Sequence, residues 1–315
     1  MREESVPSTV KSTRLPTSPD LLGESPIWDA RLQRLYWVDG VRSVLRFLDA
    51  GADQPTEIPV PSAIGSVALT DDPDRVLVAL ADGIYRADVA RSGLEPLYVP
   101  NPADRRIRFN DGKVDRQGRF VVGTMGVRAD PLGELLRLSQ DGSVTVLETG
   151  IRISNSVCFS PDGGTLYFAD SLDHAVRAYR YDDVEPLGDP QMLVDTRQFD
   201  SGPDGATVDA EGNIWVALVQ AGKIARLDPD GTLDRIIDAP VDMPSCIGFG
   251  GPDLTTLFVT SIKDSGTGRA VSQHFDGGGL FALDGLGATG IPEPHFGSEA
   301  PADDDQWYSD EREVR

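Results

Sequence analysis

Cysteine and histidine are scarce in this sequence, which limits how the chain can be stabilised and how it can bind metal. Its 315 residues include two cysteines, Cys158 and Cys246, and three histidines that stand far apart. Two cysteines do not make a disulfide framework, and isolated histidines give no support to a histidine-ligated zinc site. A hydrophobic core must therefore hold the chain together, and a chain of this length can bury a large one.

Positive charge and long apolar runs are scarce as well. The chain carries 51 acidic against 29 basic side chains, for a net charge of −22. Such a surface repels nucleic-acid phosphates and anionic lipids, so neither nucleic acid nor membrane is expected as a partner. No apolar run approaches the ~20 residues of a transmembrane helix, and residues 1–20 lack the apolar core of a signal peptide. We expect a cytoplasmic enzyme or binding protein that acts on a small molecule.

Long helix-forming stretches are also missing, and a short pattern recurs in their place. A turn sequence followed by an apolar run occurs six times, at intervals of 41 to 48 residues. The runs are Leu35–Asp39, Val76–Leu80, Phe120–Thr124, Leu166–Asp170, Ile214–Leu218 and Leu257–Ser261. Three to four antiparallel strands in each such unit are typical of a β-propeller blade. The sequence therefore predicts an all-β, six-bladed propeller, and a β-sandwich with the same spacing is the alternative.

The repeats also set the expected domain boundaries. Residues 21–296 would form the propeller as one domain. In the preceding segment, residues 1–20, the stretch Val10–Leu15 has the character of an outer strand that would close the last blade. Residues 297–315 are acidic and are expected to form a solvated tail.

Polar residues recur in register at the predicted starts of the innermost strands, which would line the central channel. Counting back ten or eleven residues from each apolar run gives Glu24, Gly65, Asn110, Asn155, Asp204 and Cys246. Two carboxylates in a narrow channel need compensating positive charge. Oxygen ligands suit one divalent cation, Ca²⁺ foremost, with Mg²⁺, Mn²⁺ or Zn²⁺ as options. The alternative is that these residues cap turns. Strand alternation is expected to point Lys113 away from the channel.

Four stretches of the chain resemble the senescence marker protein/gluconolactonase (regucalcin-like) family of lactone hydrolases. They are Gly23-Glu24-Ser-Pro-Ile-Trp28; Arg108-Phe-Asn110-Asp-Gly-Lys-Val-Asp115 followed by Gly123-Thr-Met125; Ser154-Asn155-Ser156 before Phe159-Ser-Pro-Asp-Gly163; and Gly202-Pro-Asp204-Gly205. The resemblance extends from about Leu21 to Phe296 and implies a six-bladed propeller. It also implies that Glu24, Asn155 and Asp204 hold the metal, and that Arg108 and Asn110 contact the substrate.

The activity that this resemblance implies is the metal-dependent hydrolysis of a sugar lactone to the aldonic acid. Asp204 is then the candidate to accept a proton from the attacking water. The family's best-studied members carry an acidic residue soon after the Gly-Thr-Met element, where this chain has Arg128. The resemblance therefore does not identify which sugar lactone is the substrate. Two alternatives remain. One is a calcium-dependent propeller esterase or phosphotriesterase-like hydrolase of hydrophobic lactones, and the other is a non-enzymatic calcium- or ligand-binding propeller.

Overall fold

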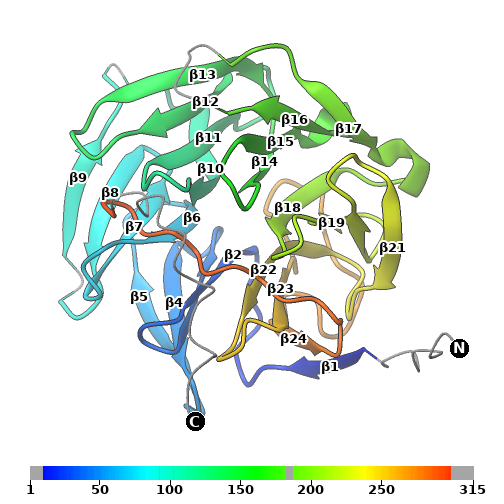
Figure 1. The fold of residues 1–315 in the computed structure, drawn as a ribbon. Helices are drawn as coiled ribbons and strands as arrows, with labels where there is room; N and C mark the ends of the chain where they lie inside the picture. The colour runs from blue at the N-terminus through cyan, green and yellow to red at the C-terminus, as the bar shows by residue number, and fades with distance from the viewer. Residues whose placement is uncertain (1–9, 92, 102, 182–186, 299–315) are drawn as a thin grey trace, which may run out of the picture.

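The computed structural model describes residues 10–91, 93–101, 103–181 and 187–298. Six four-stranded antiparallel sheets are arranged as blades around a central channel (Figure 1). The predicted all-β, six-bladed propeller is confirmed. The predicted acidic tail lies almost entirely outside the described residues. Among the residues that the structure describes, no helix has the length and hydrophobicity that a membrane crossing requires.

Each blade runs from the channel outwards through an inner, a second, a third and an outer strand. The inner strands are β2 (Gly23–Asp29), β6 (Ile64–Leu69), β10 (Ile107–Val114), β14 (Ser154–Phe159), β18 (Pro203–Val208) and β22 (Pro244–Gly250). The second strands are β3 (Arg34–Asp39), β7 (Arg75–Leu80), β11 (Phe120–Gly126), β15 (Thr165–Asp170), β19 (Ile214–Leu218) and β23 (Thr256–Ser261).

The third strands are β4 (Val44–Asp49), β8 (Gly83–Asp88), β12 (Gly133–Leu138), β16 (Ala175–Arg180), β20 (Lys223–Leu227) and β24 (Phe281–Asp284). The outer strands are β5 (Thr56–Pro59), β9 (Leu94–Tyr98), β13 (Val144–Ile151), β17 (Gln191–Asp195), β21 (Leu233–Asp238) and, from the start of the chain, β1 (Lys11–Arg14). Two single-turn 3-10 helices accompany blade four: η1 (Ser171–Asp173) connects β15 to β16, and η2 (Thr196–Phe199) follows β17. Strand β1 pairs antiparallel with β24, so the start of the described chain completes the last blade, as the sequence predicted.

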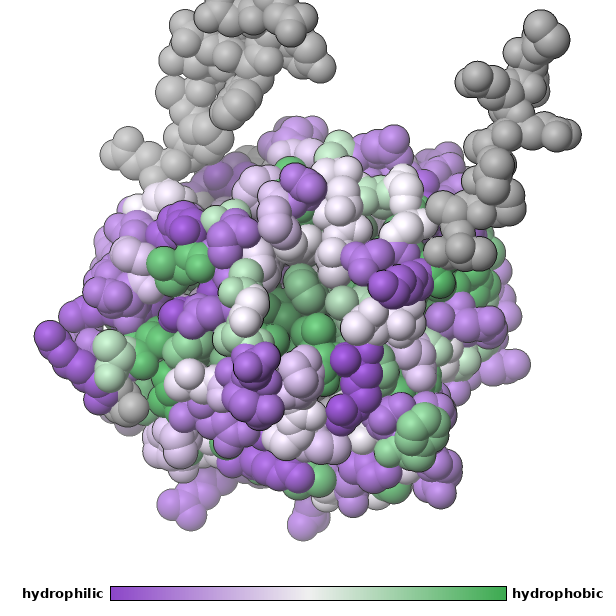
Figure 2. Space-filling model, turned by 90° about the horizontal axis from the view of Figure 1, so that it is seen from below, coloured by the Kyte–Doolittle hydropathy of each residue, from purple (hydrophilic) through white to green (hydrophobic). Residues whose placement is uncertain are grey.

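The hydrophobic core lies between neighbouring blades. The second strands are buried on both faces, which is why they appear in the sequence as continuous apolar runs rather than alternating ones. Trp215 of β19 is fully buried and meets Phe249 of β22 edge-on, with 5.6 Å between ring centroids. The side of the molecule in Figure 2 is mostly hydrophilic, as the net charge of −22 leads one to expect.

Every inner strand carries a bulge just after its first residues. The register against the second strand shifts between Glu24 and Ile27, and between Asn155 and Cys158, and the other four blades show the same irregularity. A bulge interrupts the regular alternation of side chains and re-aims those near it. In blade six Pro244 pairs with Ser261 as Ser154 pairs with Asp170 in blade four, but the hairpin between the paired residues is one residue longer. The sixth residue in the predicted ring is therefore Ser245, and the prediction of Cys246 was one residue off.

The bulges also correct the expectation for Lys113. Its Nζ lies 3.5 Å from the carbonyl oxygen of Ala206, on the inner strand β18, so the side chain points across the channel. It donates a hydrogen bond of 3.1 Å to Glu293. Strand alternation, counted without the bulge between Phe109 and Gly112, placed it on the wrong side.

Glu293 belongs to a C-terminal strap, residues 286–298, that crosses the end of the channel opposite the strand starts. Gly290 bridges to Asp209 in blade five, and Phe296 bridges to Thr70 in blade two. In Figure 1 this segment runs in orange and red across the middle of the propeller. Burial works against the charged form of Lys113, but the combined charges of its neighbours, of which Glu293 contributes most, raise the pKa of the amine. The side chains of Lys113 and Glu293 are 15% and 10% exposed.

We expect Glu293→Ala to lower the free energy of unfolding by about 2–3 kcal/mol, because it leaves the Lys113 ammonium buried without its counter-charge. Urea unfolding measures the change. The matched control is Asp238→Ala, which breaks the exposed pair between Lys223 and Asp238 (side chains 41% and 87% exposed) and should cost less than about 1 kcal/mol. Equal losses for the two variants would contradict a buried pair.

Candidate functional site

A cavity of about 210 Å³ opens where the inner strands begin, and it brings together all five residues that the sequence selected. Its lining includes Glu24 of β2, Arg108 and Asn110 of β10, Asn155 of β14 and Asp204 of β18. These strands come from blades one, three, four and five. Equivalent positions in separate blades converge here because a propeller turns every inner strand toward the same axis.

Glu24 and Asp204 face this cavity without a basic partner. Neither forms an ion pair within 4 Å in the described part of the chain. Burial, followed by repulsion from Asp204 and Asp111, raises the pKa of Glu24 well above its ordinary value, against the weaker influence of Arg108. Burial and the charge of Asp111 likewise raise the pKa of Asp204. Two adjacent buried carboxylates are unfavourable as anions unless a cation joins them.

Asn155 is held by a chain of hydrogen bonds that crosses three blades. Its Nδ2 donates to Ser171 Oγ at 2.8 Å, and its Oδ1 accepts from Asn110 Nδ2 at 3.0 Å. Ser171 in turn donates to the carbonyl oxygen of Pro203, the residue before Asp204, at 2.8 Å. With its nitrogen occupied, Asn155 offers its amide oxygen to the cavity.

Arg108 and Asn110 form the other wall of the cavity. Arg108 Nη1 donates to Asn110 Oδ1 at 2.7 Å and to the carbonyl oxygen of Phe109 at 2.9 Å. Burial lowers the pKa of Arg108, and Glu24 is the charge that opposes this. A guanidinium remains charged even so, and its other N–H groups are left to bind a polar ligand.

Asp111 was not among the predicted site residues, although it adjoins one. It accepts a hydrogen bond of 2.9 Å from the backbone N–H of Val157, which links blade three to blade four, and its charge acts on both Glu24 and Asp204. The bulge in β10 is what turns it toward the channel. The tripeptide Asn110-Asp-Gly112 carries no signal in the sequence that would separate this role from that of a turn.

The charges along the channel allow a test of whether a divalent cation fits. Four carboxylates lie along it, those of Glu24, Asp111, Asp204 and Glu293, against the cationic side chains of Arg108 and Lys113 and, at the mouth, Arg269. Glu293 pairs with Lys113, whereas among the described residues the carboxylates of Glu24 and Asp204 have no ion-pair partner, and a divalent ion between them would neutralise both. No cluster of three or more His, Cys, Asp or Glu side chains suited to a metal occurs among the described residues. A site here must include the amide oxygen of Asn155, and an all-oxygen set of this kind suits Ca²⁺.

Two serines beside the predicted ligands hold unusual backbone conformations. Ser25 follows Glu24 with φ 54°, and Ser156 follows Asn155 with φ 59°. Both use their hydroxyl to bind the next blade: Ser25 Oγ exchanges hydrogen bonds with the backbone of Val67, and Ser156 Oγ donates to the carbonyl oxygen of Asp204. Left-handed backbone outside glycine is strained and concentrates at functional sites. Here it sets the direction in which Glu24 and Asn155 point.

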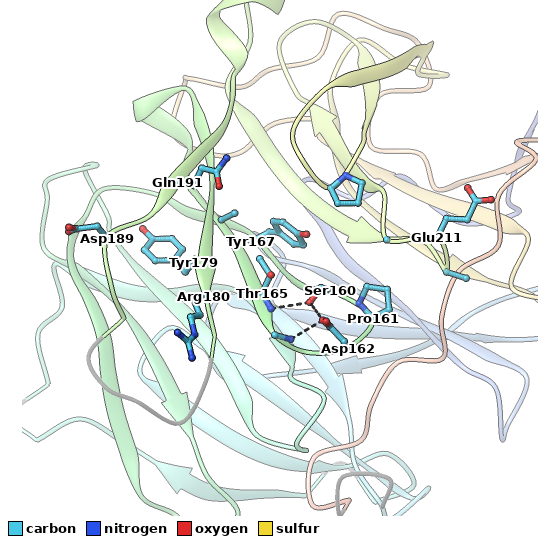
Figure 3. A pocket seen from close by; sticks show the side chains of 15 residues that line it. Ser160, Pro161, Asp162, Thr165, Tyr167, Tyr179, Arg180, Asp189, Gln191 and Glu211 are labelled. Carbon is cyan, nitrogen blue, oxygen red and sulfur yellow. Dashed lines mark hydrogen bonds between the residues drawn. The ribbon is translucent and has the colours of Figure 1, made fainter. Parts of the chain in front are cut away.

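Another hollow lies on the opposite face, between blades four and five (Figure 3). Its volume is about 710 Å³, but none of the predicted site residues lines it. Of its acidic residues Asp162, Asp189 and Glu211, the first accepts hydrogen bonds from Ser160 Oγ at 2.5 Å and from the N–H of Gly164 at 3.0 Å, and Glu211 pairs with Arg226 at 2.7 Å. It offers no convergent set of free catalytic groups, and the channel cavity is the candidate site.

Comparison with known proteins agrees with this geometry. Residues 22–263 match the profile of the SMP-30/Gluconolactonase/LRE-like region. A 6-deoxy-6-sulfogluconolactonase of Pseudomonas putida is 34% identical over 281 residues, covering 88% of this chain and 96% of the relative. A pentonolactonase of Haloferax volcanii is 36% identical over 295 residues, covering 89% and 96%. The crystal structure of a calcium-binding protein, regucalcin from Agrobacterium tumefaciens, superposes with a TM-score of 0.81 at 29% identity, covering 90% and 96%.

Proposed function

Because this chain belongs to the SMP-30/gluconolactonase/LRE-like family, it is a lactone-hydrolysing enzyme, and we propose that it opens sugar lactones with the help of one divalent cation. Glu24, Asn155 and Asp204 would hold the cation, and Ca²⁺ is the first choice. The observation that carries the proposal is the pair of unpartnered carboxylates facing a guanidinium and two amides in one cavity. The lactonases among its relatives support the reaction class.

The substrate would enter with its hydroxyl groups toward Arg108 and Asn110. Arg108 supplies donors only, and Asn110 offers both a donor and an acceptor, so the pair can bind vicinal hydroxyls in a fixed orientation. The chain of hydrogen bonds from Arg108 through Asn110 to Asn155 would fix the position of this substrate-binding pair relative to the cation-holding residues. A bound divalent cation would supply a Lewis acid for the carbonyl oxygen.

Asp204 would accept the proton of the attacking water. It has two carboxylate oxygens, one to hold the cation and one to act as the base, and its enclosed position limits competing water. A carboxylate bound to a cation is a weakened base, and the raised pKa that burial gives Asp204 opposes that weakening. After ring opening, the same oxygen can give the proton to the departing ring oxygen, which thereby becomes a hydroxyl group.

The experiment is a panel of lactones followed by acid release, each with chelator and with Ca²⁺, Mg²⁺, Mn²⁺ or Zn²⁺ restored. We expect polyhydroxylated five- and six-membered lactones to be opened faster than unsubstituted or aryl ones, and only with metal present. Arg108→Ala should mainly raise KM, by roughly tenfold or more for one charged hydrogen-bonding group. A clear preference for aryl or long-chain lactones would contradict a sugar substrate.

A larger hollow beside the channel cavity, lined in part by apolar and aromatic side chains, is the reason to keep the hydrophobic-substrate alternative in the panel. It has a volume of about 530 Å³ and shares Arg108 with the channel cavity. Its lining includes Tyr98, Phe109, Leu132 and Leu136. Aryl esters and alkyl lactones are therefore the informative comparison with sugar lactones.

A further inference from the structure

Four arginines near the candidate site lack the partners that arginines have elsewhere in the chain. Most described arginines pair with a carboxylate, as Arg106 does with Asp104 at 2.6 Å and Arg226 does with Asp209 at 2.8 Å. The exceptions near the site, which we call the arginine wall, are Arg105, Arg108, Arg128 and Arg269. None of the four forms an ion pair with any described carboxylate. In a protein with a net charge of −22, four unpaired cations beside one cavity require an explanation.

Hydrogen bonds join the loops that carry this wall. The N–H of Val127 donates to the carbonyl oxygen of Arg106 at 2.7 Å, which joins the loop of Arg105 to that of Arg128. Arg269 Nη2 donates to the carbonyl oxygen of Arg128 at 2.8 Å. Arg108 and Arg269 both line the channel cavity, and Arg105 lines the hollow that shares Arg108 with it. Arg108 and Arg269 therefore lie on the channel cavity itself, Arg105 on the adjoining hollow, and Arg128 in the loop that Arg269 contacts.

None of the described carboxylates around the wall forms an ion pair with it, although Asp82, Asp104 and Glu134 line the hollow that holds Arg105. Asp104 is taken by Arg106, and Asp264 accepts a hydrogen bond of 2.9 Å from the N–H of Gly266. The hydrogen bond and charge of Asp104 raise the pKa of Arg106, and the charge of Asp130 adds a smaller contribution. The acidic residues that line the channel cavity are Glu24 and Asp204, and a divalent cation would neutralise both. The mouth would then be positively charged within a strongly acidic surface, which is the local field that draws in and holds an anion.

We propose that the lactone this enzyme opens carries an anionic substituent, a carboxylate, sulfonate or phosphate remote from the ring carbonyl, and that the arginine wall binds it. The inference rests on the proposed function and narrows its substrate class to acidic sugar lactones. Guanidinium groups bind such oxyanions with two parallel hydrogen bonds, which are stronger than those to neutral hydroxyls. The acidic surface would otherwise repel this substrate, so the wall would provide both affinity and selectivity.

The test compares three lactones on the metal-loaded enzyme: neutral D-gluconolactone, D-glucaro-1,4-lactone with its carboxylate, and 6-phosphogluconolactone. At least one anionic lactone should show a KM roughly tenfold below that of the neutral one. Its KM should rise with added salt more steeply than the KM of the neutral lactone, because salt screens exposed charges. Whichever of the two anionic lactones is preferred distinguishes a carboxylate from a phosphate.

Arg269→Gln should raise the ratio of anionic to neutral KM roughly fivefold, as expected for one partly exposed charged hydrogen bond. The matched control is Arg91→Gln, which removes an arginine that is likewise unpaired but lies in the turn after β8, at the other end of the blades; it should leave the ratio unchanged. Equal or better use of the neutral lactone, or equal effects of the two variants, would overturn the inference while leaving lactone hydrolysis intact. If none of the lactones is opened, the proposed function fails, and this inference fails with it.

Discussion

Asp204→Asn should lower kcat by roughly 10²- to 10⁴-fold, and saturating metal should not restore it. Asparagine keeps the size of the side chain and one carbonyl oxygen, so it can still hold a cation, but it cannot accept a proton. The propeller should survive, because Asp204 lines the channel and contributes nothing to the core between blades. The measurement is kcat against metal concentration, with circular dichroism to verify folding.

Glu24→Gln is the matched comparison for Asp204→Asn. It removes the same charge from the same cavity, but from a residue that we place only around the cation. Excess metal should therefore recover much of its rate. If the Asp204 variant also recovers, Asp204 is a ligand alone; if it is folded, metal-saturated and close to wild-type kcat, it has no part in the mechanism.

Exhaustive chelation should abolish activity and lower Tm. A ligand that binds only the folded state stabilises it, by roughly 2.7 kcal/mol at a hundredfold excess over Kd. The chelated protein should also lose stability as the pH rises above the ordinary range of carboxylates. Burial raises the pKa of Glu24 and Asp204, so the folded state keeps protons there that the unfolded chain has released. The gap in Tm between metal-loaded and chelated protein should therefore widen with pH.

Scanning calorimetry with and without chelator at several pH values measures this gap, and the Glu24→Gln variant provides its control. One carboxylate fewer should weaken metal binding and at the same time relieve the repulsion in the chelated state, so its gap should be smaller at every pH. An unchanged Tm and undiminished activity after chelation, with no stoichiometric metal by elemental analysis, would remove the cation from the account.

The fold could be predicted because its signal is repeated. A run such as Leu35–Asp39 is buried between blades, and burial on both faces leaves a continuous apolar sequence at a constant spacing. The convergence of the candidate site residues could be predicted for the same reason: Glu24, Asn155 and Asp204 stand ten or eleven residues before those runs. Each repeat alone is a weak indication of structure, but six repeats with the same pattern together predict the blade.

Features that do not repeat, or that depend on exact register, could not be predicted. The hairpin of β22 and β23 is one residue longer than that of β14 and β15, which moves the sixth ring position from Cys246 to Ser245, and the bulge in β10 turns Lys113 into the channel. Ser171 and His174 line the cavity from the segment after β15, where the sequence shows only an ordinary turn. The contact between Lys113 and Glu293 joins residues 180 positions apart, and no local pattern carries such information.

The central claim is that one cation is held between three blades, and the most direct test is a crystal grown with Mn²⁺ and measured for anomalous scattering. We predict a single strong peak in the channel cavity, with Glu24, the amide oxygen of Asn155 and Asp204 at roughly 2.0–2.6 Å. The peak should disappear in crystals of Glu24→Gln grown at limiting metal. A metal-saturated crystal with no peak in this cavity, or with its peak at other residues, would contradict the account.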